Sequence, residues 1–310
     1  MPGIWIYSED SAVAKQLLTA GLSLKQSLQQ PVNVLTLAAS DAPGLVQAGA
    51  DKVVVLQGTN PWPESYSAAI EKQVQAEQAS VLLVGATLRG KDLAAKVAAG
   101  LKAGLVTDAL TVNYVNGAVE TTRLIYGGLA VRTEAVPFPA LVTIPPRTFA
   151  EATSCGGQGT VVTVEVNNDV NGVTMQNVCP IVRQGADIAA ASRVVAVGRG
   201  LGNQADLGLA EQLAAAIGAE IGCTRGISED YHWLPNDRYI GISGQKIKPE
   251  LYIGMGISGQ VQHVVGIRDA KVIVAIDANE KAPIFDAADY GIVGDLYEVV
   301  PLLTAALQKK

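Results

Sequence analysis

The sequence predicts a two-domain α/β protein in which helices cover mostly parallel sheets. Its 310 residues are 49% hydrophobic but only 5% aromatic, and Ala, Val, Ile, Leu and Gly dominate, as is usual for buried parallel strands. Short apolar runs of strand length alternate with longer helical patterns from the N-terminus onward. A chain of this length can bury a large core, and it commonly divides into two domains.

Residues 1–187 are predicted to form an N-terminal doubly wound α/β domain. Its opening half alternates apolar runs with amphipathic stretches, which indicates repeated strand and helix units. The expected strands cover residues 4–7, 32–37, 52–56 and 81–85, and the expected helices cover 12–29, 66–78 and 93–100.

The pattern changes near residue 109, where β-branched residues alternate with polar ones. Asn116-Gly117 interrupts this alternation and is a strong signal for a tight β-hairpin. Further strands are expected over residues 140–144, 161–166 and 173–182. The first domain is therefore expected to end in a mostly antiparallel extension.

Residues 188–310 are predicted to form a second domain with its own small, doubly wound parallel sheet. The segment 183–192 (RQGADIAAAS) has no clear core pattern, so the domain boundary is placed there. Right-handed crossovers would bring the strand carboxyl ends, and any ligand, to one edge of the sheet. The expected strands cover 193–197, 220–223, 251–256 and 271–277, and the helices cover 206–217, 260–266 and 296–308.

Charge and composition argue against several classes of function. The formal charge is −6 and no dense Lys/Arg run occurs, so nucleic acid is not expected as the main partner. No apolar run approaches the roughly 20 residues of a membrane helix, and no export signal is visible, which favours a cytoplasmic protein. Cys155, Cys179 and Cys223 lack metal-site spacing, so they are expected to be reduced and no metal site is predicted.

The stretch LYIGMGISGQVQH, residues 251–263, is the most informative part of the chain. A predicted strand ends in Gly256, Ser258 and Gly259 before a predicted helix that contains His263. Glycine turns that lead into a helix commonly hold phosphate groups with backbone N–H groups. His263 is one of two histidines in the chain, and the alternatives for it are a ligand-binding role or a core or capping role.

Other strand ends add glycines and a cation to the same predicted edge. The Gly198-x-Gly200-x-Gly202 spacing differs from G-x-G-x-x-G, so it supports a dinucleotide-binding dehydrogenase only weakly. Arg225 could pair with a nearby carboxylate of its own segment, or it could place a fixed positive charge beside a planar ligand that becomes anionic. No hydrolase triad, zinc-protease motif or Walker lysine occurs.

Several long segments of the chain resemble the electron transfer flavoprotein alpha subunit. In the second domain these are PELYIGMGISGQVQH (249–263) and APIFDAADYGIVGDLYEVVP (282–301), together with the Cys223-Thr224-Arg225 corner. In the first domain they are GATLRGKDLAAKVAAGL (85–101), YGGLAV (126–131) and PRTF (146–149). The resemblance covers essentially the whole chain and implies that the second domain binds FAD.

The resemblance also implies roles for individual residues. Arg225 would lie over the isoalloxazine ring, Ser243 would reach its N5 atom, and His263 would hydrogen-bond its C2 carbonyl. Ile242 and Asp277 depart from the Gln and Asn that are common in the family. Ser258, Gly259 and Gln262 would hold the pyrophosphate and ribityl region, Arg199 would neutralise phosphate charge, and Asp277 and Asp295 would reach the adenosine end. The complete set implied at the cofactor is Arg199, Thr224, Arg225, Gly241, Ile242, Ser243, Gly256, Ile257, Ser258, Gly259, Gln262, His263, Asp277, Asp295 and Leu296.

The function that this resemblance implies is electron carriage rather than substrate chemistry. The chain would pair with an electron transfer flavoprotein beta subunit, accept electrons from an acyl-CoA dehydrogenase or similar flavoenzyme, and pass them to a quinone oxidoreductase or another acceptor. Its segments look most like the branch linked to anaerobic carnitine or acyl-CoA metabolism and nitrogen fixation. Some members of that branch bifurcate electrons from NADH with a second FAD. An NAD-dependent dehydrogenase and a non-flavin nucleotide-binding regulator remain the alternatives from other classes.

Overall fold

The computed structural model describes residues 2–168, 173, 175–179 and 187–308. Contacts within the chain divide it into two compact units, Met1–Gln176 and Asn177–Lys310. The predicted α/β class with two domains is confirmed. The division precedes the predicted boundary between residues 187 and 188, and residues 180–186 beside that boundary lie outside the described part of the chain.

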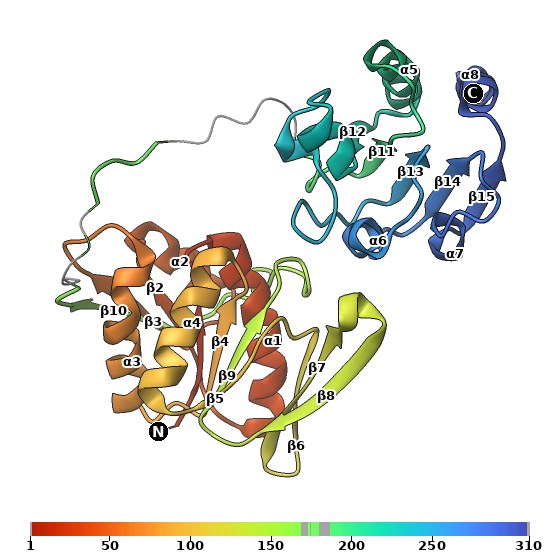
Figure 1. Ribbon diagram of the computed structural model, residues 1–310. Coiled ribbons are helices and arrows are strands. Elements are labelled where there is room, and N and C mark those ends of the chain that lie inside the picture. The colour runs from red at the N-terminus through yellow and green to blue at the C-terminus, as the bar shows by residue number, and fades with distance from the viewer. Residues whose placement is uncertain (1, 169–172, 174, 180–186, 309–310) are drawn as a thin grey trace. The chain divides into compact units, whose positions relative to one another are not determined.

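The first unit is built on a seven-stranded sheet in which every neighbouring pair is parallel (Figure 1). Central strands such as β1 and β4 are buried along their whole length, which explains their continuous apolar sequences. The strand order is β10-β3-β2-β1-β4-β9-β5. The strands are β1 (Ile4–Tyr7), β2 (Val32–Thr36), β3 (Lys52–Gln57), β4 (Val81–Gly85), β5 (Gly104–Val106), β9 (Ala140–Ile144) and β10 (Thr160–Glu165).

Helices cover both faces of this sheet. The apolar residues of α1 (Ser11–Leu28) and α2 (Ala42–Gln47) share one core cluster with alternate strand residues, and those of α3 (Ser67–Ala76) and α4 (Leu88–Leu101) share the other. The Asp10 carboxylate caps α1 by accepting from the amides of the second and third residues after it. Helix α2 and strand β5 were not predicted from the sequence.

The predicted hairpin at Asn116-Gly117 is confirmed. Strands β6 (Thr111–Val115) and β7 (Ala118–Ile125) pair antiparallel, and both turn residues have positive φ, as a two-residue type I′ turn requires. Strand β8 (Ala130–Val136) completes this antiparallel sheet.

The antiparallel extension is shorter than predicted. Strands β9 and β10 join the parallel sheet instead. Strand β9 is buried at every position and lies between β4 and β5, and β10 pairs with β3 at the edge of the sheet. The strand expected over 173–182 is absent from residue 173 and from residues 175–179, and its remaining positions lie outside the described residues.

The second unit contains a five-stranded parallel sheet with the order β12-β11-β13-β14-β15. The chain order reverses between β11 and β13, and the crevice at such a switch point is where open α/β sheets bind ligands. The strands are β11 (Arg193–Val197), β12 (Glu220–Cys223), β13 (Leu251–Met255), β14 (Ile273–Asp277) and β15 (Tyr290–Val293). The short edge strand β15 was not predicted.

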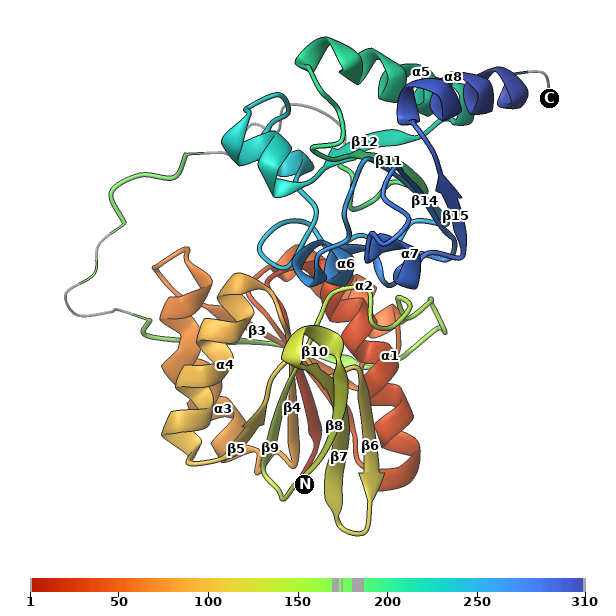
Figure 2. The same cartoon turned by 45° about the vertical axis from the view of Figure 1, so that its right-hand side comes forward.

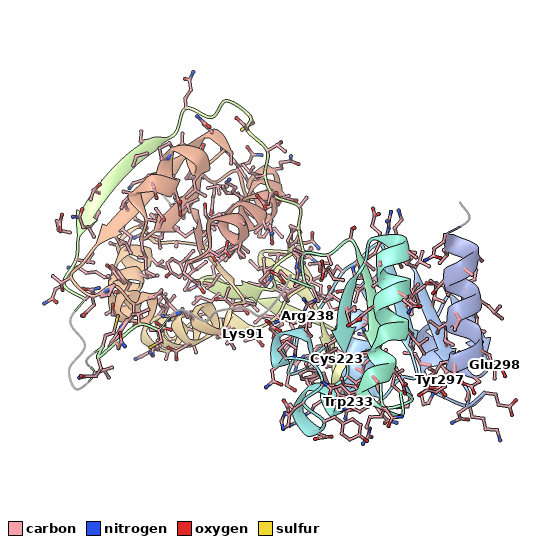
Figure 3. All side chains as sticks on the ribbon, turned by 90° about the horizontal axis from the view of Figure 1, so that it is seen from above. Lys91, Cys223, Trp233, Arg238, Tyr297 and Glu298 are labelled. Atoms are coloured by element: carbon pink, nitrogen blue, oxygen red, sulfur yellow. The ribbon has the colours of Figure 1, made fainter. Side chains whose placement is uncertain are left out.

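The helices of the second unit lie on both faces of its sheet (Figure 2). Helices α5 (Leu207–Ile217) and α8 (Leu296–Leu307) pack on one face, and α6 (Val261–Ile267) and α7 (Ile284–Ala287) on the other. The Tyr297 hydroxyl (Figure 3) donates to the Asp206 carboxylate at 2.6 Å and so joins the starts of α8 and α5. Across the described ranges, no helix has the length and apolar character needed to cross a membrane.

Candidate functional site

A large cavity lies in the second unit, at the carboxyl ends of four parallel strands. Its volume is about 750 Å³, and the loops after β11, β12 and β13 contribute to its wall together with Asp277, the last residue of β14. This is the edge at which the sequence predicted a ligand. The lining residues are Arg199, Gly200, Thr224, Arg225, Gly226, Asp230, Tyr239, Ile240, Ile242, Ser243, Gly256, Ile257, Ser258, Gly259, Gln260, Gln262, His263 and Asp277.

Glycines let the loops after β11 and β13 touch at the base of this cavity. The Gly198 amide donates to the Met255 carbonyl at 3.0 Å, and the Gly200 amide donates to the Gly256 carbonyl at 2.9 Å. A Cβ atom on Gly198 would lie 2.3 Å from the Gly256 oxygen, so no larger residue fits there. Gly256 has a φ of 61°, a backbone conformation that residues other than glycine rarely adopt. The glycines found by sequence reasoning therefore hold two loops together and keep the space above them open.

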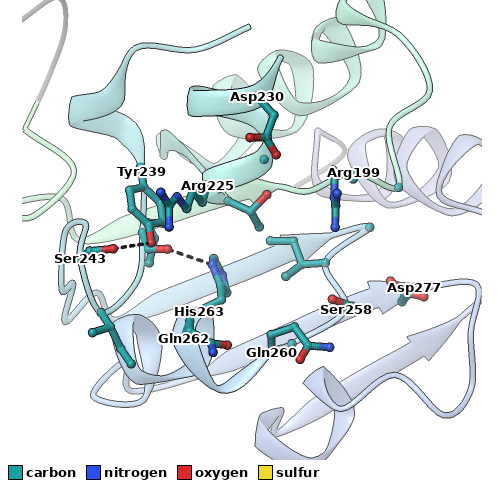
Figure 4. A pocket seen from close by; sticks show the side chains of 18 residues that line it. Arg199, Arg225, Asp230, Tyr239, Ser243, Ser258, Gln260, Gln262, His263 and Asp277 are labelled. Carbon is teal, nitrogen blue, oxygen red and sulfur yellow. Dashed lines mark hydrogen bonds between the residues drawn. The ribbon is translucent and has the colours of Figure 1, made fainter. Parts of the chain in front are cut away.

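Two arginines and two aspartates place opposite charges on the cavity wall. Arg199 and Asp277 lie toward one end, and Arg225 lies toward the other (Figure 4). The Arg225 Nε atom donates to Glu229 at 2.5 Å, and its side chain is 66% exposed. This hydrogen bond raises the pKa of the guanidinium above its ordinary value. Arg225 thus pairs with its own segment and also lines the cavity, and its role beside a ligand stays a prediction.

A hydroxyl pair lies at the same end of the cavity as Arg225 (Figure 4). The Tyr239 hydroxyl and the Ser243 Oγ are 3.1 Å apart, and either can donate. When Tyr239 donates, the Ser243 hydrogen is available to a ligand. The Ile242 amide donates to the Gln262 carbonyl at 2.8 Å, which fixes this loop against the start of α6. Tyr239 and the bond between this loop and α6 therefore hold the Ser243 hydroxyl, which the family resemblance singled out.

His263 lies on the cavity wall, but both of its nitrogens have protein partners. Its Nδ1 atom lies 3.1 Å from the Ile240 carbonyl oxygen, and its Nε2 atom lies 2.8 Å from the Tyr252 hydroxyl. Burial lowers the pKa of His263 to about 4, against a smaller raising effect of the Ile240 carbonyl. The ring is therefore neutral near pH 7. A donor role toward a ligand stays a prediction, and it would require the imidazole to give up or share one of these two partners.

Three residues of the predicted set do not line this cavity. Gly241 lies between two lining residues, Ile240 and Ile242. The Asp295 carboxylate accepts from the Tyr297 amide at 2.8 Å and caps α8. The Leu296 side chain is buried in the core, against the position that a Cβ on Gly256 would take. Contacts of these three residues with a ligand remain predictions.

The cavity also contains residues that sequence reasoning did not select. Gly200 belongs to a glycine cluster that was noted, and Gln260 lies within the informative stretch 251–263. Asp230 and Tyr239 lie at the ends of single helical turns after β12, which are too short for periodicity to indicate which side chains face inward. Tyr252 lies outside the cavity and reads as an ordinary core residue of a strand. The cavity residues missed are Gly200, Gly226, Asp230, Tyr239, Ile240 and Gln260.

The arrangement suits a long, phosphate-bearing ligand with a planar group better than it suits hydrolysis. One end offers Arg225, two hydroxyls and a buried imidazole, and the other offers Arg199 and Ser258 near Asp277 (Figure 4). Within the described ranges, no cluster of three or more His, Cys, Asp or Glu side chains could hold a metal ion.

Comparison with known families decides between the remaining classes. Residues 187–268 match the family model described as the electron transfer flavoprotein FAD-binding domain, and residues 5–169 match the electron transfer flavoprotein domain. The chain belongs to the electron transfer flavoprotein alpha-subunit family. FAD is accordingly its cofactor, and the family implies a beta-subunit partner.

Curated relatives agree with this membership over almost the whole chain. Protein FixB of Shigella dysenteriae serotype 1 is 37% identical over 311 residues, which cover 99% of this chain and 98% of that protein. Protein FixB of Escherichia coli strain K12 has the same identity and coverage. Protein FixB of Salmonella paratyphi A is 36% identical over the same length. The resemblance recognised from the motifs is therefore confirmed.

Proposed function

We propose that this chain holds FAD in the cavity of its second domain and carries electrons between a dehydrogenase and an acceptor. The donor would be an acyl-CoA dehydrogenase or a similar flavoenzyme, and the acceptor a quinone oxidoreductase or a second dehydrogenase. The first domain would serve as the platform for the beta subunit. The heterodimer would work in the cytoplasm.

The observation that carries this proposal is a cation, Arg225, on the wall of a cavity at the strand carboxyl ends of a domain of the FAD-binding type. Bound FAD supplies reversible uptake of one or two electrons. The Arg225 guanidinium stays protonated and can lie flat against a ring system, so it would stabilise negative charge on the reduced cofactor. The Ser243 hydroxyl, supported by Tyr239, would donate a hydrogen bond to the ring.

The opposite end of the cavity would bind the phosphates and the adenosine. Arg199 is exposed, and the stem of its side chain lies against Gly226, which leaves the guanidinium within reach of phosphate oxygens. The loop after β13 would contribute the Ser258 hydroxyl, the Gly259 backbone and the Gln262 amide. The Asp277 carboxylate, at the end of β14, would accept from a ribose hydroxyl. Asp295 and Leu296, at the start of α8, would lie beside the adenosine.

Co-purification with the beta subunit tests this proposal. A yellow heterodimer is expected, whose flavin an acyl-CoA dehydrogenase reduces when its substrate is present. A colourless heterodimer that gains no flavin from added FAD would refute the cofactor site. A flavin that this dehydrogenase never reduces would refute the proposed electron donor and leave the FAD site standing.

The number of flavins distinguishes simple carriage from electron bifurcation. One FAD per heterodimer is expected for a simple carrier. Two FADs, with reduction by NADH, would indicate the bifurcating type, whose second flavin would belong to the beta subunit. An NAD-dependent dehydrogenase would instead oxidise its own substrate without any flavin, and the Gly198-x-Gly200-x-Gly202 turn gives that alternative little support.

A further inference from the structure

The Tyr239 phenol lies inside the loop that carries Ser243 on the cavity wall. Tyr239 is only 7% exposed, although it lines the cavity. The loop closes on itself, since the Gln245 amide donates to the Tyr239 carbonyl at 2.7 Å and the Gly241 amide donates to the Gln245 carbonyl at 3.1 Å. A Cβ atom on Gly244 would lie 2.7 Å from the Tyr239 Cδ1 atom, and one on Gly241 would lie 3.0 Å from the phenol oxygen. These two glycines therefore leave the space that the tyrosine ring fills.

The hydrogen bond between Tyr239 and Ser243 has a preferred direction. The two oxygens are 3.1 Å apart, and geometry alone allows either to donate. A phenol is a stronger acid than an aliphatic alcohol, so it is the better donor and the poorer acceptor of the two. The pKa of Arg225 is raised mainly by Glu229 and to a smaller extent by the Tyr239 phenol, so cation and phenol interact. A nearby cation makes the phenol a stronger acid still, which also favours Tyr239 as the donor.

The Ser243 hydroxyl is left to act toward the cavity. Ser243 is exposed, and among the described residues Tyr239 is the hydrogen-bond partner of its side chain. A hydroxyl that accepts a hydrogen bond keeps its own hydrogen for another acceptor, and it becomes a better donor through polarisation.

We propose that Tyr239 is a positioning residue that donates to Ser243, fixes its side chain, and so directs the serine hydrogen toward the cofactor. The inference rests on the proposed function in one respect, namely that the ligand facing Ser243 is FAD. Tyr239 then acts on the flavin through Ser243 and makes no contact of its own with the ring.

Midpoint potentials of bound FAD, measured in a double-mutant cycle, test whether Tyr239 acts through Ser243. Ser243→Ala should lower the potential, because negative charge on the reduced ring loses a donor. Tyr239→Phe keeps the ring in place but removes its donor, and it should lower the potential by a smaller amount. In the Ser243→Ala background, Tyr239→Phe should cause no further change. Tyr290→Phe, an exposed tyrosine of the same domain, is the matched control and should leave the potential unchanged.

The sign of the Tyr239→Phe shift tests the direction of the hydrogen bond. If Ser243 donated to the phenol, removing the phenol oxygen would release the serine hydrogen to the cofactor and the potential would rise. A rise or an unchanged potential would overturn the proposal. A fall of equal size with and without the Ser243 hydroxyl would also overturn it, because Tyr239 would then act on the ring directly or through the loop as a whole.

Carbon NMR of the tyrosine Cζ atoms measures the hydroxyl pair independently of the cofactor. The heterodimer is labelled with ¹³C-tyrosine and measured with and without FAD, and Tyr239→Phe assigns the signal. Ser243→Ala should shift the Tyr239 signal, whereas Ser258→Ala, which removes another hydroxyl of the cavity, should not. An unshifted signal in Ser243→Ala would overturn the proposal even where a variant fails to retain FAD. A heterodimer that binds no FAD but shows the shift would refute the proposed function and leave the bond between Tyr239 and Ser243 standing.

Discussion

Burial of His263 predicts that the second domain loses stability as the pH falls below neutrality. Burial lowers the pKa of this imidazole from an ordinary 6.5 to about 4. A histidine with a depressed folded-state pKa binds its proton more readily in the unfolded chain, so protonation favours unfolding. The contribution is fully present above about pH 6.5 and is lost as the pH falls through about 4.

The size of the effect follows from the same two pKa values. Each unit of pKa difference corresponds to about 1.4 kcal/mol, so the full loss approaches roughly 3 kcal/mol below about pH 4. Near pH 5 the unfolded imidazole is almost fully protonated and the folded one is mostly neutral, and the loss is about 2 kcal/mol. That is a large part of the free energy of unfolding of an ordinary domain.

Urea unfolding at about pH 7.5 and about pH 5 measures this loss. Trp233 is the only tryptophan of residues 177–310, so its fluorescence follows the second domain once Trp5 and Trp62 are replaced by Phe in every variant compared. In that background, His263→Gln should reduce the pH dependence by about 2 kcal/mol, whereas His232→Gln, at an exposed position, serves as the matched control. Equal losses of stability in the His263→Gln protein and its parent would refute the reasoning, since carboxylate titrations are common to both.

Three further predictions concern the cavity and its surroundings. Arg225→Ala should lower the midpoint potential of bound FAD, and Arg225→Lys should restore part of the difference; an unchanged reductive titration would contradict the role of the cation. Gly198→Ala should destabilise the second domain by about 1–3 kcal/mol and weaken FAD retention, because its methyl group would meet the Gly256 carbonyl. Gly208→Ala is the control, since its Cβ meets open space on a helix and should stabilise by about 0.5–1 kcal/mol in urea unfolding. Burial raises the pKa of Cys223 to about 12, so mass spectrometry after brief alkylation should find it unmodified while the two exposed cysteines react.

Apolar periodicity predicted the central strands well because parallel strands buried on both faces are continuous apolar runs. Apolar periodicity did not predict elements whose formation or pairing depends on packing against other helices and strands. Strand β15 has only four residues, all exposed, so its sequence carries no burial signal. Helix α2 has six residues and begins Ala-Pro-Gly, which suggests a turn. The sequence of β9 indicates a strand but not its partner, because β-propensity does not distinguish parallel from antiparallel pairing.

The cavity was predictable to the extent that ligands bind at the carboxyl ends of parallel strands. That rule, with the family's motifs, selects the loops after β11, β12 and β13 and the end of β14 from the sequence alone. Side-chain partners could not be found this way. Tyr252 and His263 are eleven residues apart and meet only because the strand and the following helix fold back on each other. Asp230 and Tyr239 end single helical turns, which are too short for a periodic pattern to indicate the direction of a side chain.

Arg225 pairs with Glu229 in its own segment and also lines the cavity. The five-residue π-helical turn from Gly226 to Asp230 places Glu229 where it accepts from the Arg225 Nε atom. An exposed pair of residues four apart contributes little to stability, so the guanidinium can leave Glu229 at small cost. While the pair persists, however, the carboxylate offsets part of the positive charge that faces the cavity. Replacing Glu229 with Gln should therefore raise the FAD midpoint potential, opposite in sign to the loss of Arg225, whereas Glu211→Gln on the exposed face of α5 should not change it. A Glu229→Gln potential equal to that of the unaltered heterodimer would mean that Arg225 has already exchanged this carboxylate for the cofactor.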